Sequence, residues 1–366
     1  MLLLLLLVLS PADAGRRKRN EPPPAPAPPP PKPLSETPWV SGLVVPLGPL
    51  PAGLANPTAA GCAACHTDPY QAWTAGAHGG PPPGTIAALS PEEGCTGCHL
   101  PLVEQRPRTG SFGFGTEQPP SAPQPFSATL WEEGVGCAAC HVVDGSVLAA
   151  RHVDDAPHAV VGSGTLGGAE GCATCHQLEV DGVVWYDTYT SWEASPYAAA
   201  GVACRDCHAP HGQKAGPGVS LLVDLPTDSL TRGGAPIAAS VVVQNTGAGH
   251  SWPSSGPYSG VELVVRLVGP LDEDGRPTEA ARFATPLARR LGSDGQPASD
   301  TRLPPMGSAS FPVELALDQQ APAGPWHLEV ALRRTTLADP VAGEDTAPDG
   351  PYEDAVPRVW MPLSVD

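Results

Sequence analysis

The chain has 366 residues, 38 acidic and 20 basic, with a formal net charge of −18. This charge argues against nucleic acid and anionic membrane surfaces as partners, and it is compatible with basic docking partners. Aromatic residues make up only 5%, and 41 glycines and 48 prolines are present, so large side chains are too few for a conventional core in the first half. The length suggests about two domains.

The chain begins with MLLLLLLVLSPADAG, a short apolar run that ends at the cleavage-like sequence Ala12-Asp13-Ala14. The run is too short to span a bilayer, and the basic residues Arg16–Arg19 follow it instead of preceding it. We expect an atypical signal peptide over residues 1–14 and a periplasmic or otherwise extracytoplasmic protein. The alternative is a buried N-terminal helix, which the following proline tract disfavours. Membrane association is left open.

Residues 15–58 are expected to form a basic and proline-rich linker. Its stretch NEPPPAPAPPPPKP (Asn20–Pro33) cannot form a helix or a sheet and favours extended polyproline II. The segment is either a stiff spacer or an ordinary disordered lead-in.

All ten cysteines lie in five copies of the pattern CxxCH. The copies are Cys62, Cys65 and His66; Cys95, Cys98 and His99; Cys137, Cys140 and His141; Cys172, Cys175 and His176; and Cys204, Cys207 and His208. Zinc sites need four ligands, and five pairs cannot be divided into such sites without a remainder. A thioredoxin-like motif occurs once and needs no following histidine.

Covalent haem attachment accounts for every feature of the pattern. Two thiols bind the two porphyrin vinyl groups, and the adjacent histidine becomes the proximal ligand of the iron. The sequence therefore predicts five covalently attached c-type haems between residues 62 and 211, whose porphyrins would supply apolar mass that the side chains lack.

Six further histidines are candidates for the second axial position of each iron. His327 lies in PWHLEVALRR, where it falls on the face opposite Trp326 and Leu328, so an exposed strand histidine is favoured. His250 lies in a Gly/Ser/Pro-rich loop that is free to reach outwards. The candidate distal ligands are His78, His152, His158, His211 and His250. Each is otherwise a surface histidine, and we expect bis-histidine coordination for most or all haems.

The stretches GCAACHTDPYQAWTAGAHG (61–79) and GCATCHQLEVDGVVWYDTYTSWEASPYAAAGVACRDCHAPHG (171–212) resemble multihaem cytochromes c of the hydroxylamine-oxidoreductase-related class. This class includes small tetrahaem cytochromes of ammonia oxidation, and the resemblance covers about residues 60–212. It implies that His78, five residues after Trp73, is a distal ligand. The same count from Trp192 reaches Tyr197, which either packs on a porphyrin edge, as we favour, or leaves an iron open or weakly ligated.

Cysteines stop after about Gly218, and short alternating or β-branched runs begin. The expected strands cover residues 219–225, 237–245, 261–269, 311–317, 326–334 and 360–365. Such strands without helices between them suggest an antiparallel, immunoglobulin-like sandwich. Some similar cytochromes carry a domain of this kind with the loop Asn245–His250 and the stretch Asp300–Pro305, which implies that His250 ligates a haem of the preceding domain.

The expected fold class is a mainly α or irregular multihaem cytochrome c domain (59–217) followed by an all-β, immunoglobulin-like sandwich domain (218–366). The favoured function is an exported electron carrier that serves a respiratory chain. Its redox partners would be a quinol-side donor and a terminal acceptor or reductase, with no nucleic acid. The alternative is a multihaem oxidoreductase that acts on a small nitrogen or sulfur compound at one five-coordinate haem. A docking subunit is a third interpretation.

Overall fold

The computed structural model describes residues 47–80, 95–105, 127–143, 145–180, 183–208, 211, 218–254, 256, 259–292, 297–336 and 358–365. Contacts divide the chain into one unit of Met1–Pro30 and another of Pro31–Asp366. The expected signal peptide and the proline tract Asn20–Pro33 lie outside the described residues.

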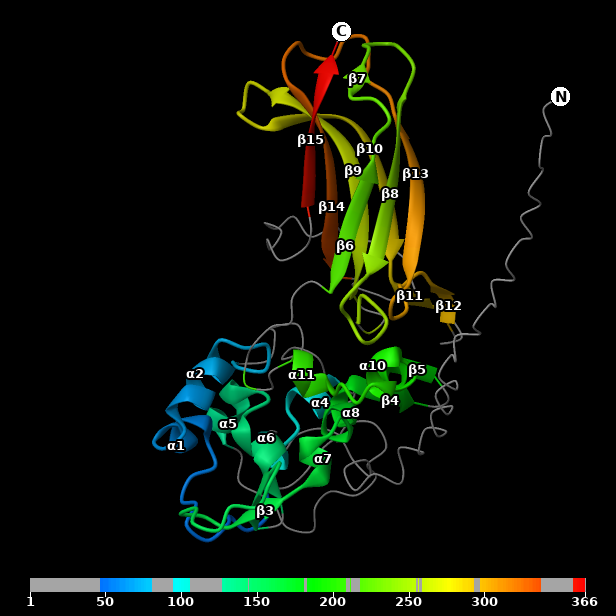
Figure 1. Cartoon of the computed structure of the whole chain (residues 1–366). Coiled ribbons are helices and arrows are strands. Elements are labelled where there is room, and N and C mark those ends of the chain that lie inside the picture. The colour runs from blue at the N-terminus through cyan, green and yellow to red at the C-terminus, as the bar shows by residue number, and fades with distance from the viewer. Residues whose placement is uncertain are drawn as a thin grey trace, which may run out of the picture. The chain divides into compact units, whose positions relative to one another are not determined.

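The helices of the described part are all short (Figure 1), with four to eight residues in each α-helix and three in the one 3-10 helix. They are α1 (Ala59–Ala63), α2 (Thr67–Thr74), α4 (Cys95–His99), α5 (Ala128–Glu133), α6 (Cys137–His141), α7 (Gly164–Gly167), α8 (Glu170–His176), α9 (Thr188–Glu193), α10 (Pro196–Ala199), α11 (Cys204–Cys207) and the 3-10 turn η3 (Val103–Gln105). Helix α5 shows why: the Ser127 side chain caps its start, and Gly134 at φ 61° ends it. Few side chains accept that left-handed conformation without strain.

Strands also occur among the CxxCH motifs. A three-stranded sheet contains β1 (Val142–Val143), β2 (Ser146–Ala149) and β3 (Val160–Gly162), and a hairpin contains β4 (Gln177–Val180) and β5 (Val183–Asp187). Both follow a CxxCH helix directly, because the valine-rich residues after His141 and His176 favour extended backbone.

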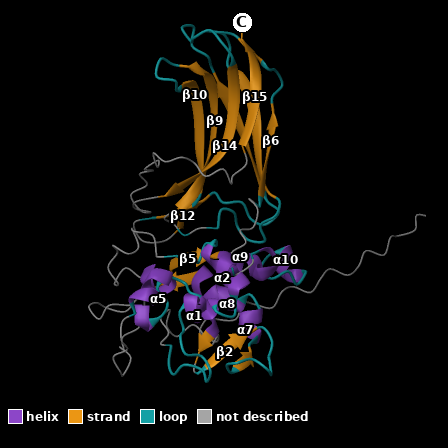
Figure 2. Cartoon of the chain, turned by 90° about the vertical axis from the view of Figure 1, so that its left-hand side faces the viewer, coloured by secondary structure: helices purple, strands orange, loops and turns teal. Residues whose placement is uncertain are grey.

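The C-terminal half forms two larger sheets (Figure 2). One has the order β10-β9-β14-β15-β7, from β10 (Pro277–Leu287), β9 (Ser259–Leu271), β14 (Trp326–Thr336), β15 (Arg358–Val365) and β7 (Ser229–Leu230). The other has the order β13-β8-β6, from β13 (Ser308–Leu315), β8 (Ile237–Asn245) and β6 (Val219–Asp224). A small hairpin joins β11 (Arg289–Leu291) and β12 (Pro297–Asp300).

One hydrophobic core lies between the two larger sheets. Strand β8 alternates buried and less buried residues, and Val241 and Val243 are fully buried. From the other sheet, Val265 of β9 pairs in register with Val330 of β14, and both are fully buried. Burial of the twenty residues of this cluster stabilises the C-terminal half.

The expected fold class is wrong. The described chain is mostly strand, its helices are short, and strands occur among the haem motifs as well, so the region 59–217 is not a mainly α or irregular cytochrome domain. The C-terminal β region agrees only with the second part of the expected fold class, the all-β domain. The physical reason is local: serine side chains cap the starts of α5, α7 and α10, glycines follow the ends of α5 and α7, and valine-rich segments pair into small sheets. No described helix is long and apolar enough to cross a bilayer.

Candidate functional site

Each of the five CxxCH segments coincides with a short helix. Helices α4 and α6 begin at the first cysteine and end at the histidine of their motifs, and α8 ends at His176. Helix α1 contains Cys62, and α11 spans Cys204–Cys207. One helical turn brings the two cysteines of a motif to the same side, because residues three apart lie on one face.

Four proximal histidines each face one of the candidate distal histidines. The ring-centre distances are 6.3 Å for His66 and His158, 6.3 Å for His78 and His176, 6.0 Å for His141 and His211, and 6.1 Å for His208 and His250. The ring planes of the last two pairs are inclined by only 18° and 21°. Every pair combines residues from separate segments of the chain, so the fold and not local sequence brings them together.

These separations fit a metal ion held between two imidazoles. A metal–imidazole bond of about 2.0–2.1 Å, added to about 1.2 Å from the nitrogen to the ring centre, gives about 6.4 Å across two such ligands. The residues present therefore fit a haem iron, which takes its other four ligands from the porphyrin. The described residues contain no cluster of three or more side chains that could hold a bare metal ion.

Hydrogen bonds of the paired histidines leave a nitrogen free for a metal. His141 Nδ1 lies 2.7 Å from the carbonyl oxygen of Leu148, and His250 Nδ1 lies 3.1 Å from that of Ser251. A carbonyl oxygen only accepts, so Nδ1 carries the proton and Nε2 keeps its lone pair. His158 Nδ1 is buried without a hydrogen-bond partner in the described structure, a state that a bound group would relieve.

Burial keeps four of the paired imidazoles neutral, those of His176, His208, His211 and His250. It lowers the pKa of His176 to about 4, with further lowering by neighbouring histidines. Burial also lowers the pKa of His208, His211 and His250 below the ordinary histidine value. A neutral imidazole is the form that binds a metal, so no proton has to leave at neutral pH.

His152, the fifth candidate distal ligand, is not brought opposite a proximal histidine. Its Nδ1 donates to the carbonyl oxygen of Val160 at 2.8 Å, and its Nε2 lies 3.0 Å from Asp154 Oδ1. Both ring nitrogens are therefore engaged, and the side chain is 63% exposed.

His99 is the one proximal histidine without a facing imidazole. All eleven histidines lie within the described residues, and eight of them form the four pairs. His327 packs edge-on against Trp360 at 5.6 Å on the C-terminal sheet. With His152 engaged as well, the described chain offers no further histidine for the iron expected at His99.

Tyr197, where the resemblance places a departure from histidine, contacts the loop that carries His250. Its hydroxyl lies 3.5 Å from the carbonyl oxygen of Thr246 and 3.7 Å from Met306 Sδ. A Cβ on Gly249 would lie 3.3 Å from the Tyr197 ring, so the glycine lets the loop pack closely there.

Cysteines of different motifs lie in contact. Hydrogen-bonded thiol pairs join the first motif to the third, the fourth to the fifth and the second to the fourth. In the first pair, the hydrogen bond with Cys137 lowers the pKa of Cys62 to about 7 and raises that of Cys137. The haems expected on these motifs would therefore be close neighbours.

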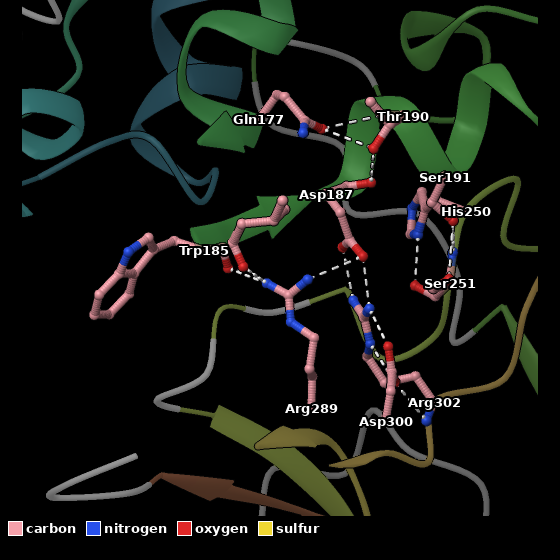
Figure 3. Close-up of polar contacts among 11 residues, drawn as sticks. Gln177, Trp185, Asp187, Thr190, Ser191, His250, Ser251, Arg289, Asp300 and Arg302 are labelled. Atoms are coloured by element: carbon pink, nitrogen blue, oxygen red, sulfur yellow. Dashed lines mark hydrogen bonds and ion pairs between the residues drawn. The ribbon is translucent and has the colours of Figure 1, made fainter. Parts of the chain in front are cut away.

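A buried ion-pair cluster, which sequence reasoning missed, lies beside His250 (Figure 3). Arg302 donates to both carboxylate oxygens of Asp187, at 2.8 and 2.6 Å, and its side chain is only 3% exposed. Arg289, 4% exposed, donates to Asp187 at 3.2 Å and to the carbonyl oxygens of Val184 and Trp185. Asp300 pairs with Arg302 from the outer side at 2.6 Å.

Arg302 holds the pKa of Asp187 below its ordinary range. Burial alone would raise this pKa, but the hydrogen bonds from Arg302 and the charges of Arg302 and Arg289 outweigh it. We name Asp187, Arg289, Asp300 and Arg302 the Asp187 cluster. The only hint in the sequence was the stretch Asp300–Pro305, whose acceptor Asp187 lies far away in the chain.

Comparison with known proteins identifies no family for this chain. No protein-family model and no curated protein matches the chain. Among solved structures, it is similar to AvmM, which catalyses macrocyclisation in alchivemycin A biosynthesis, with 15% identity over 40% of this chain and 89% of the other, and a TM-score of 0.24. A CARDB domain from Pyrococcus furiosus, in complex with di-metal ions, gives 11% identity over 42% of this chain and 95% of the other, and a TM-score of 0.22. These scores are too low to support an argument.

Proposed function

We propose that this chain is an exported electron-transfer protein with five covalently attached c-type haems, one on each CxxCH segment. The observation that carries the proposal is the set of four histidine pairs with ring centres 6.0–6.3 Å apart. Each pair joins a proximal histidine to a predicted distal ligand. When bound, the haems would supply the one-electron iron couple. The ten cysteines would anchor them, and the paired imidazoles would fix their axial ligation.

The small core of the haem-motif region supports this proposal. Among the described residues of this region, the hydrophobic cluster contains five buried ones, Leu47, Leu102, Leu130, Ala138 and Val142, and the cluster of the C-terminal half contains twenty. A core of this size stabilises a chain of about 150 residues poorly, because buried apolar area provides most of the folding free energy. Five porphyrins would add the apolar surface that the side chains do not provide.

Contacts between the motifs support transfer of electrons from haem to haem. The cysteine pairs place the first motif beside the third, the second beside the fourth and the fourth beside the fifth. The chain would then fix the spacing of the haems and set their reduction potentials through axial ligands, hydrogen bonds and burial. Its redox partners would be a quinol-side donor and a terminal acceptor or reductase in the periplasm, docking through basic surfaces.

The test is the haem content of protein produced in cells that attach c-type haem, measured as pyridine haemochrome per chain. The proposal predicts five haems for the unaltered chain. The double variant Cys137→Ser/Cys140→Ser should hold four, because one attachment site is lost. A haem-free protein with ten titratable thiols would contradict the proposal.

His99 favours a second candidate function, that of an oxidoreductase acting on a small nitrogen or sulfur compound. The described chain gives this histidine no imidazole partner, so its iron would have a position for an external ligand. A high-spin ferric signal equal to one haem per chain would support this function. Five low-spin haems would exclude the oxidoreductase function and support the electron-transfer function.

A further inference from the structure

Asp187 occupies the N-cap position of α9, yet its side chain makes no hydrogen bond to that helix. An aspartate at this position normally accepts from the backbone N–H of the second or third helical residue. Here Gln177 Oε1 accepts from the N–H of Thr190 at 3.1 Å instead. The Asp187 carboxylate is thus left for Arg302 and Arg289.

The Asp187 cluster joins two segments that are distant in sequence. Asp187 follows strand β5, which belongs to the haem-motif region, whereas Arg289, Asp300 and Arg302 belong to the C-terminal half. Arg302 forms a two-pronged pair with Asp187, a geometry that fixes orientation as well as distance. Since both arginines are nearly fully buried, loss of their partner would leave buried charges poorly compensated.

The segment after Arg302 is bonded to the loop that carries His250. Leu303 and Trp252 exchange two backbone hydrogen bonds of 2.8 Å. The side-chain amide of Asn245 donates to the carbonyl oxygens of both His250, at 2.9 Å, and Leu303, at 3.2 Å. Displacement of Arg302 would therefore displace the backbone of His250.

A second contact ties the same loop to α9. The backbone N–H of Ser251 donates to Ser191 Oγ at 2.7 Å, and the two serine hydroxyls lie 2.9 Å apart. Helix α9 thus meets the loop at Ser191 and its N-cap residue meets Arg302. His250 lies beside Ser191 and Ser251 (Figure 3). Its ring centre lies 6.1 Å from that of His208.

We propose that Asp187 and Arg302, supported by Arg289, are positioning residues that hold His250 opposite His208 as the axial ligand of the fifth haem. This inference rests on the proposed function, because it needs a haem between the two rings. The cluster determines whether one particular iron is six-coordinate, and it leaves the other four haems unaffected.

The experiment compares the unaltered haem-loaded protein with Asp187→Ala, Asp187→Asn and His250→Ala by low-temperature EPR, with haem counted in each sample. Asp187→Ala should lose one low-spin signal and gain one high-spin signal, as His250→Ala does. Asp187→Asn keeps the size of the side chain and leaves Arg302 paired with Asp300, so this variant is expected to fold even if Asp187→Ala does not. It should give a partial loss of the low-spin signal at the same haem. Glu262→Gln, which breaks the exposed pair with Arg282 at 2.8 Å, is the matched control and should change no haem.

The double variant Asp187→Ala/His250→Ala separates positioning from a general structural role. It should give the spectrum of His250→Ala, because the ligand that the cluster holds is already gone. A further haem change in the double variant, or five haems with unchanged spectra in both Asp187 variants, would overturn the inference. Failure of the proposed function looks different: the unaltered protein would lack haem, or His250→Ala itself would leave every haem signal unchanged.

Discussion

The imidazole rings of His208 and His250 face each other with their centres 6.1 Å apart and their planes inclined by 21°. His208 completes the last CxxCH motif, whereas His250 lies in a loop of the C-terminal half. This separation suits a haem iron between the rings. Ligation of the fifth haem would then depend on both halves of the chain.

His250→Ala and His152→Ala should have opposite consequences, although both residues were predicted as distal ligands. The first removes an imidazole that faces a proximal histidine, so one haem should become high-spin. The second removes an exposed side chain bonded to Asp154 and Val160, so every haem should stay unchanged. EPR of the two haem-loaded variants makes the comparison. A new high-spin haem in His152→Ala would show that His152 serves an iron.

Cyanide should bind one haem per chain in the unaltered protein and two in His250→Ala. The first site is the haem on His99, which has no second imidazole in the described structure, and the second is the haem that the variant opens. Optical titration measures the stoichiometry, and His327→Ala is the control because His327 packs against Trp360, away from the pairs. If the unaltered protein binds none, the iron at His99 has a sixth ligand.

Leu263→Ala should destabilise the C-terminal half by about 2–5 kcal/mol, because Leu263 is fully buried in the core and its loss leaves a cavity. Leu222→Ala is the matched control, since Leu222 is 54% exposed and should change stability by less than about 0.5 kcal/mol. Denaturant unfolding followed by tryptophan fluorescence measures both variants. Equal effects would contradict the assigned core.

The free energy that Asp187 contributes to folding should depend on pH in a defined direction. Because Arg302 keeps its folded-state pKa below the ordinary carboxyl value, the contribution is complete above about pH 4 and falls as pH drops through the lower folded-state value. The difference in unfolding free energy between the unaltered protein and Asp187→Asn should thus be constant from about pH 7 to 5 and shrink below about pH 4. Denaturant titrations at several pH values measure it. A difference that grows on acidification would contradict the assigned pairing.

Strands with strict alternation were predictable from sequence. The expected strand 237–245 coincides with β8, and 326–334 lies within β14, because one face of each strand packs in the core. The haem-motif region was not predictable in the same way. Its helices are too short to have a periodic pattern. The hairpin of β4 and β5 was missed although the sequence Asp181-Gly182 between its strands is a strong two-residue hairpin signal.

The histidine pairs were predictable as a set of residues but not as partners. The sequence could not show that Asp154 and Val160 engage His152, because this depends on local geometry. The Asp187 cluster had only the stretch Asp300–Pro305 as a sequence signal, since 115 residues separate Asp187 from Arg302 and isolated charges are usually solvated.

The most direct test of the account is near-infrared magnetic circular dichroism of the oxidised protein, with haem counted as pyridine haemochrome in the same sample. The account predicts five haems per chain, four of them with bis-histidine ligation and one, on His99, without a second histidine. Absence of covalent haem, or fewer than four bis-histidine haems in a fully loaded protein, would contradict the assignment of the four histidine pairs as axial ligands.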